Sequence, residues 1–298
     1  MKKLILMAAA AMMVLASCTK TTVESIDGPK EISFNKFEGA MTKASDHTGD
    51  LGAYAIVHET NDLYFTNIQF SKGDLYWIGN PKQYWPLTSK LDFVVYSPYD
   101  NTNVSYNPTS KILTIDNIDN SSTTTDWLYG DKLYNNDGTG FDKNTTYVPV
   151  VLKHAMAKVT FKVIANVDGV FTLTNLTLND VNQAGKIDVS YAPSITVTPT
   201  LASPNVLVDK TFSGDQTIGT TETNIITDYI VFPSEQTSFN ISYKMYELSE
   251  TQNNIDITGN WEPGKHYIYT ITLTANEIKF DADVDGWVDT VVPTNTVN

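Results

Sequence analysis

Histidine, cysteine and carboxylate side chains are the groups in this chain that could perform chemistry, and their spacing limits what that chemistry can be. The four histidines, His47, His58, His154 and His266, do not pair with one another, or with a second cysteine, at the spacing of a metal site. The chain also lacks a G-x-S-x-G nucleophile elbow, a phosphate-binding P-loop and a dinucleotide-binding glycine motif. We therefore expect a protein that is not an enzyme, has no cofactor and uses its histidines for ordinary hydrogen bonds.

One acidic segment near the C-terminus has the beginning of a calcium-binding loop. Asp281, Asp283 and Asp285 occupy positions 1, 3 and 5 of that pattern, and Gly286 follows at position 6. The loop needs a bidentate glutamate at position 12, where this chain has Val292. Apolar residues continue through the segment, so the sequence favours a C-terminal strand with solvated acids and no metal; a weak calcium site is the alternative.

The only cysteine, Cys18, is the residue with the clearest covalent chemistry. Lys2 and Lys3 precede a short apolar run over residues 4–15, which is typical of a secretory signal and too short to span a bilayer. The run Leu15-Ala16-Ser17-Cys18 looks like a bacterial lipobox, in which the chain is cut before the cysteine and its thiol and new amine are acylated. Two or more acyl chains give a stable membrane anchor. We therefore predict a signal peptide over residues 1–17 and a lipidated tether over residues 18–30.

The charge of the chain excludes one class of partner. The formal net charge is −14, and it becomes −16 when Lys2 and Lys3 leave with the signal peptide. Nucleic-acid binding needs a basic face, so we expect no nucleic-acid partner. All 20 basic residues are lysines, and the absence of arginine excludes bidentate arginine contacts to phosphate.

Apolar residues that alternate with polar ones predict an all-β protein. Val159, Phe161 and Val163 alternate in this way, and between residues 171 and 178 the alternation slips at Asn175, which predicts a bulge. Many short strands separated by turns favour a β-sandwich, and the chain is long enough for two. Three prolines between residues 193 and 204 interrupt the pattern. We therefore expect an N-terminal β-sandwich domain over residues 31–190 and a C-terminal one over residues 191–298.

Several short motifs, taken in order, resemble those of the Bacteroidales fimbrillin-like family. No single motif is specific for the family, but the occurrence of all of them in the same order after a lipobox is. The matching segments are Glu31-Ile-Ser-Phe34 followed by Thr42-Lys43-Ala44, Tyr84-Trp85-Pro86 followed by Leu91–Pro98, Asp126-Trp-Leu-Tyr129, Leu152–Val159, Val231-Phe-Pro233, Trp261–Leu273 and Asp285-Gly-Trp287.

The resemblance implies a type V pilus subunit with two transthyretin-like Greek-key β-sandwich domains, exported as a lipoprotein and serving adhesion. In stalk members of the family a protease removes the first strand, and a strand from the next subunit fills the groove. Mapped onto this chain, the removed strand is residues 31–37, with Ile32 and Phe34 in the core, and the cut falls between Lys43 and Ala44. The donor segment is residues 277–292, and its candidate pocket-filling residues are Ile278, Phe280, Val284, Trp287 and Val288.

The absence of arginine leaves the role within a pilus open. The family protease cuts after arginine, so either a protease accepts Lys43 or the subunit stays uncut and serves as the anchor of a pilus. The alternative function is a surface lipoprotein that binds a glycan or host ligand and never polymerises. The expected partners are other pilus subunits, the outer membrane through the lipid on Cys18, and a ligand on a host or bacterial surface.

Overall fold

In the part of the chain that it describes, the computed structural model has twenty β-strands arranged in four sheets. The structure describes residues 28–36, 49–74, 76–133, 138–246, 248–274 and 278–287. All of the secondary-structure elements assigned within these ranges are β-strands, which confirms the prediction of an all-β protein. Within the same ranges there is no helix with the length and apolar character needed to cross a membrane.

The first half of the chain builds an eight-stranded sheet in the order β10-β8-β5-β2-β3-β4-β1-β9. Its core is aromatic and aliphatic and includes Ile32, Phe34, Phe70 and Phe93. The strand β5 is buried along its whole length, as its almost wholly apolar sequence predicts. The strands are β1 (Ser33–Lys36), β2 (Leu51–Val57), β3 (Leu63–Lys72), β4 (Trp77–Asn80), β5 (Leu91–Ser97), β8 (Leu128–Gly130), β9 (Val148–Val150) and β10 (Leu152–His154).

Two four-stranded sheets, β16-β11-β19-β20 and β15-β12-β17-β18, form a sandwich nearer the C-terminus. Side chains of β11 such as Phe161 are fully buried between the sheets, and the Phe161 ring lies 5.2 Å from that of Phe239 in the opposite sheet. The register of β12 shifts between Leu173 and Asn175, which confirms the predicted bulge. The strands are β11 (Ala157–Ala165), β12 (Phe171–Asn182), β15 (Leu207–Ile218), β16 (Thr223–Val231), β17 (Ser238–Met245), β18 (Thr251–Asp256), β19 (Lys265–Leu273) and β20 (Ile278–Gly286).

The fourth sheet, in the order β14-β13-β7-β6, divides the chain differently from the predicted boundary at residue 190. It contains β6 (Val104–Asn107), β7 (Ile112–Asp119), β13 (Ala184–Ser190) and β14 (Thr196–Leu201). Strands β11 and β12 precede residue 190 but pair with strands that follow it, whereas β13 pairs with β7 from the first half. The prolines do not mark a linker, because Pro199 lies in the edge strand β14, where a missing amide is tolerated.

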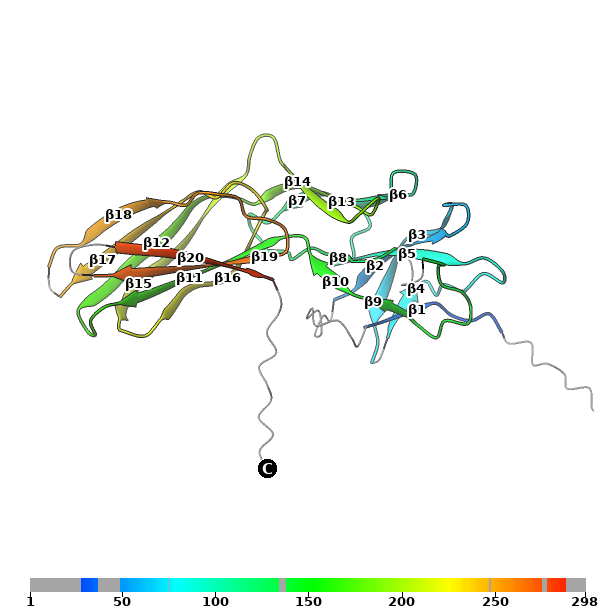
Figure 1. Cartoon of the computed structure of the whole chain (residues 1–298), viewed down its shortest axis with the longest axis horizontal. Coiled ribbons are helices and arrows are strands. Elements are labelled where there is room, and N and C mark those ends of the chain that lie inside the picture. The colour runs from blue at the N-terminus through cyan, green and yellow to red at the C-terminus, as the bar shows by residue number, and fades with distance from the viewer. Residues whose placement is uncertain are drawn as a thin grey trace, which may run out of the picture.

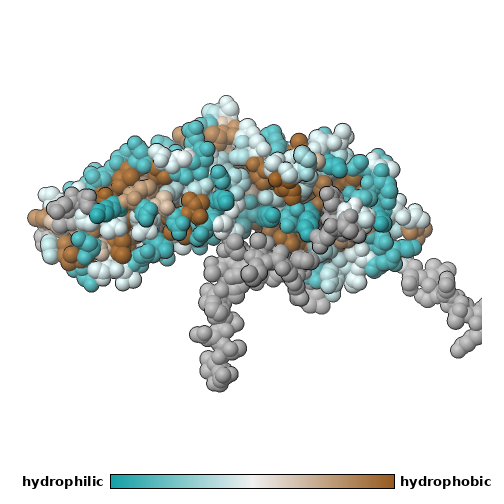
Figure 2. Space-filling view, in the orientation of Figure 1, coloured by the Kyte–Doolittle hydropathy of each residue, from teal (hydrophilic) through white to brown (hydrophobic). Residues whose placement is uncertain are grey.

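The molecule is elongated, with the C-terminal sandwich at one end and the eight-stranded sheet at the other (Figure 1). A third apolar core, which we call the junction core, joins the two ends and combines Trp127 and Tyr129 with Phe232 and Trp287. Here Gly185 allows close packing, because a Cβ atom on it would lie 2.5 Å from a ring carbon of Phe232. On the visible face, apolar side chains reach the surface in separate patches over both ends of the molecule (Figure 2).

Candidate functional site

The short strand β1 lies inside the eight-stranded sheet, between β4 and β9. Phe34 is opposite Trp77 of β4 in an antiparallel ladder and opposite Val148 of β9 in a parallel one. Just before the strand, the Ile32 amide donates to the carbonyl of Gln83 over 2.8 Å. Because β1 completes two ladders at once, its loss would leave a slot bordered on one side by an exposed edge of β4, which still pairs with β3, and on the other by the exposed edge of β9.

The two side chains predicted to hold this strand in the core do lie there. Ile32 and Phe34 both have 0% of their surface exposed. The Phe34 ring makes edge contacts with Phe70 and Phe93, at centroid distances of 4.5 and 5.4 Å. Full burial of an aliphatic or aromatic side chain contributes about 1.5–3 kcal/mol. These two residues are therefore the main apolar contribution that β1 makes to the fold.

Three of the predicted donor residues, Ile278, Phe280 and Val284, belong to the edge strand β20, which in this single chain pairs with β19. Ile278 and Phe280 are half-buried against the core of the C-terminal sandwich, and the Phe280 ring lies 5.3 Å from that of Tyr269. Val284 is 49% exposed. The aspartates of the calcium-like motif lie along this same extended strand. Among the described residues, no group of three His, Cys, Asp or Glu side chains is placed to hold a metal ion.

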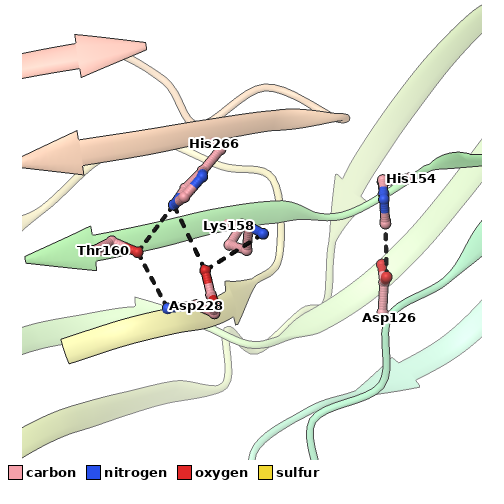
Figure 3. A network of polar contacts seen from close by, with 6 residues as sticks. All are labelled: Asp126, His154, Lys158, Thr160, Asp228 and His266. Atoms are coloured by element: carbon pink, nitrogen blue, oxygen red, sulfur yellow. Dashed lines mark hydrogen bonds and ion pairs between the residues drawn. The ribbon is translucent and has the colours of Figure 1, made fainter. Parts of the chain in front are cut away.

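Trp287 lies apart from the other donor candidates, in the junction core. Its ring stacks on that of His154 with centroids 3.7 Å apart and planes 4° apart. The Lys158 ammonium lies 4.9 Å from the Trp287 ring centroid, and the Trp287 amide donates to the carbonyl of Gly264 over 2.9 Å. On the β10 side, His154 contacts a carboxylate oxygen of Asp126 at 2.8 Å (Figure 3). The end of β20 is therefore fixed where the chain passes from β10 to β11.

A second polar cluster lies close by on the C-terminal sandwich (Figure 3). The Thr160 hydroxyl is 2.9 Å from Nε2 of His266, and Lys158 pairs with Asp228 at 3.4 Å. Burial, with a smaller contribution from the charge of Lys158, lowers the pKa of His266. His58 also contacts an aspartate, so each of the three histidines in the described ranges has a hydrogen-bond partner, as expected.

Some predicted site residues lie outside the described ranges: Cys18, Lys43, Ala44 and Val288. The lipidation of Cys18 and the cut between Lys43 and Ala44 therefore remain predictions. His47 also lies outside the described ranges.

Sequence reasoning missed one feature of the slot, a stacked pair of tyrosines. Tyr76 and Tyr147 have ring centroids 5.6 Å apart and ring planes 30° apart. They are far apart in the sequence and belong to no motif. Only the order of the strands β4, β1 and β9 brings them together.

The fold and its sequence both have known relatives. A model of the fimbrillin-like family matches residues 39–287. A comparison with curated proteins finds no match. A fimbrial protein from Bacteroides vulgatus is similar in structure, with a TM-score of 0.62 and 14% identity, covering 87% of this chain and 100% of that one. A candidate cell adhesion protein from Bacteroides uniformis has a TM-score of 0.57 and 18% identity, covering 88% and 100%. The structural likenesses establish the fold, and because the family match spans most of the sequence, the chain belongs to the fimbrillin-like family.

Proposed function

We propose that this protein is a non-enzymatic structural subunit of a cell-surface adhesive pilus, in which a strand from another subunit replaces β1. The observation that carries the proposal is the position of β1, an inner strand of its sheet that precedes the predicted cleavage segment. Loss of such a strand leaves unpaired ladder groups and an open apolar core, both of which are unfavourable. A subunit that loses β1 therefore has a strong tendency to bind a replacement strand. Membership of the fimbrillin-like family supports this role.

The sequence at the C-terminal strand supports it as the replacement. Glu277-Ile-Lys-Phe-Asp281 corresponds to Glu31-Ile-Ser-Phe-Asn35, with identical residues at three of the five positions. Side chains two residues apart point to the same face of a strand. The isoleucine and phenylalanine of β20 can therefore occupy the places of Ile32 and Phe34 in the slot of a second subunit.

Burial supplies a driving force for this exchange. Ile278 and Phe280 are only half-buried at the edge of their own sandwich, whereas Ile32 and Phe34 are fully buried in the slot. Each square ångström of apolar surface removed from water contributes about 25 cal/mol. Exchange also requires β20 to leave β19, so it is favoured only where the slot of the neighbouring subunit is empty. Removal of β1 would therefore control assembly.

The proposal includes a membrane-attached precursor. The acylated Cys18 would hold the chain at the outer membrane. A cut between Lys43 and Ala44 would separate the rest of the chain from the lipid and from β1, and would thereby allow the slot to open. A protease that accepts lysine is required, because the chain contains no arginine. A subunit that is never cut would instead keep its lipid and form the anchor of the pilus.

The test is to cut the folded chain between β1 and β2. A recognition site for a sequence-specific protease is placed within residues 38–48, and assembly after cutting is followed by electron microscopy and size-exclusion chromatography. We expect filaments or a ladder of oligomers from the cut protein and monomers from the uncut protein. A matched variant that ends at residue 276 lacks β20 and should stay monomeric after cutting.

One result would refute strand exchange: a cut, full-length chain that has released β1 and stays monomeric. Saturable binding of that monomer to a carbohydrate array would support the alternative, a surface lipoprotein that never polymerises.

A further inference from the structure

We propose that Tyr76 and Tyr147 form a clasp over the strand held between β4 and β9, and that this clasp selects the strand that a second copy of the chain can insert. The clasp acts within the proposed strand exchange, on which this inference rests. Tyr76 immediately precedes β4 and Tyr147 immediately precedes β9. These two strands lie on either side of β1.

The ladders on the two sides of β1 place both tyrosines beside its centre. Continuing the antiparallel ladder with β4 by one residue places Tyr76 beside Asn35. Continuing the parallel ladder with β9 by one residue places Tyr147 beside Ser33. The Gly73 amide donates to the Tyr76 carbonyl over 2.8 Å, which closes the turn between β3 and β4 and fixes the base of the Tyr76 side chain.

The two rings meet on the solvent side of β1. The residues that follow them, Trp77 and Val148, are 4% and 2% exposed, and successive side chains point to opposite faces of a sheet. Tyr147 itself is 38% exposed. The two neighbours of a central strand are about 9.5 Å apart, so rings whose centroids are 5.6 Å apart must lean across that strand. Phe34 thus holds β1 from the core side, and the clasp covers it from the solvent side.

The clasp restricts the residues that point outward from the strand beneath it. In β1 these are the small residues Ser33 and Asn35, and the corresponding residues of the C-terminal strand are Lys279 and Asp281. The lysine stem is unbranched and can run along a ring, while its ammonium reaches the ring face. An acidic residue at position 279 has no such interaction. The clasp should therefore favour a strand with lysine between the isoleucine and the phenylalanine.

The first measurement is retention of β1 in the full chain after a cut within residues 38–48. The rate at which the labelled N-terminal fragment leaves is compared between the wild type, Tyr76→Ala and Tyr147→Ala. We expect release to become about tenfold faster in both variants, because the stacked aromatic pair is lost. Tyr246→Ala is the matched control, since Tyr246 is an exposed tyrosine that follows β17 in the C-terminal sandwich. Equal release from all four proteins would overturn the clasp.

The second measurement is entry of a labelled peptide of residues 277–291 into the emptied slot. We expect a Lys279→Glu peptide to bind about tenfold more weakly than the natural peptide to the wild type, and the difference to shrink in Tyr147→Ala. Equal binding of both peptides to the wild type would overturn the proposed selectivity. If neither peptide binds the cut wild type, strand exchange itself fails, and the release rates alone decide whether the clasp exists.

Discussion

Replacing Phe34 by alanine should detach β1 from the slot while the rest of the chain stays folded. The Phe34 ring is fully buried and packs edge-on against Phe70 and Phe93. Truncating a buried phenylalanine to alanine costs about 3–5 kcal/mol. What remains to hold β1 is the burial of Ile32, about 1.5–3 kcal/mol, and ladder hydrogen bonds of about 1 kcal/mol each. The ordering of the freed residues opposes these contributions, so the substitution removes most of the net stability of β1 in the slot.

The assay for this prediction is hydrogen exchange followed by mass spectrometry on the uncut chain. A loss of about 3–5 kcal/mol corresponds to exchange about 10²- to 10⁴-fold faster in the peptide covering residues 28–36. Peptides from β11 and β12 should keep their protection, because those strands belong to the C-terminal sandwich. Phe280→Ala is the matched control. It removes the same ring from a half-buried edge position and should leave exchange in β1 unchanged.

Two results would refute this reasoning about Phe34→Ala. Unchanged exchange in β1 would mean that burial of Phe34 does not hold the strand. Equal loss of protection throughout the eight-stranded sheet would mean that β1 cannot leave without unfolding its neighbours. The second result would also remove the physical basis for strand exchange.

Three further predictions concern the junction and the C-terminal sandwich. Because the pKa of His266 is lowered from 6.5 in the folded chain, the unfolded chain binds more protons as the pH falls through 6.5. The stability present above pH 6.5 is therefore lost on acidification, and His266→Gln should flatten that part of a plot of melting temperature against pH; an unchanged slope would contradict this. Gly185→Ala would place a Cβ atom 2.5 Å from the ring of Phe232 and should destabilise the fold by about 1–3 kcal/mol in urea denaturation, whereas Gly28→Ala, with no atom within 4 Å, should be neutral. Trp287→Ala should speed hydrogen exchange in β20 but not in β12. If β20 exchanges at the same rate in the variant as in the wild type, the ring does not hold that strand.

The sequence could predict strands wherever one face of a strand is buried. In β11, Val159, Phe161 and Val163 are all fully buried and alternate with more polar residues, so the pattern is readable without a structure. The bulge at Asn175 was predictable for the same reason, because a slip in alternation is local. Strand β15 could not be recognised, since nearly all of its side chains are exposed or half-buried and it shows no apolar period.

Features that depend on the order of strands in a sheet could not be predicted. The core positions of Ile32 and Phe34 were implied by the resemblance to the fimbrillin-like family, and both side chains are fully buried in the structure. The contact between Tyr76 and Tyr147 depends on β1 pairing with both β4 and β9, which no local pattern encodes. The strand pairing across the predicted boundary near residue 190 could not be predicted for a related reason. After β12 the chain goes back to the first half of the molecule, where β13 pairs with β7. A local pattern of apolar residues does not show which distant strand a segment will pair with.

The return of the chain to the fourth sheet has a mechanical consequence. The backbone passes between the two ends of the molecule three times, after β10, after β12 and after β14. A force applied along the long axis is therefore carried by three covalent passages side by side. It cannot extend the connection between β10 and β11 alone until the ladder of β13 with β7 has been pulled apart. A chain that crosses its own junction three times resists stretching as one unit, which fits the proposed role as a pilus subunit.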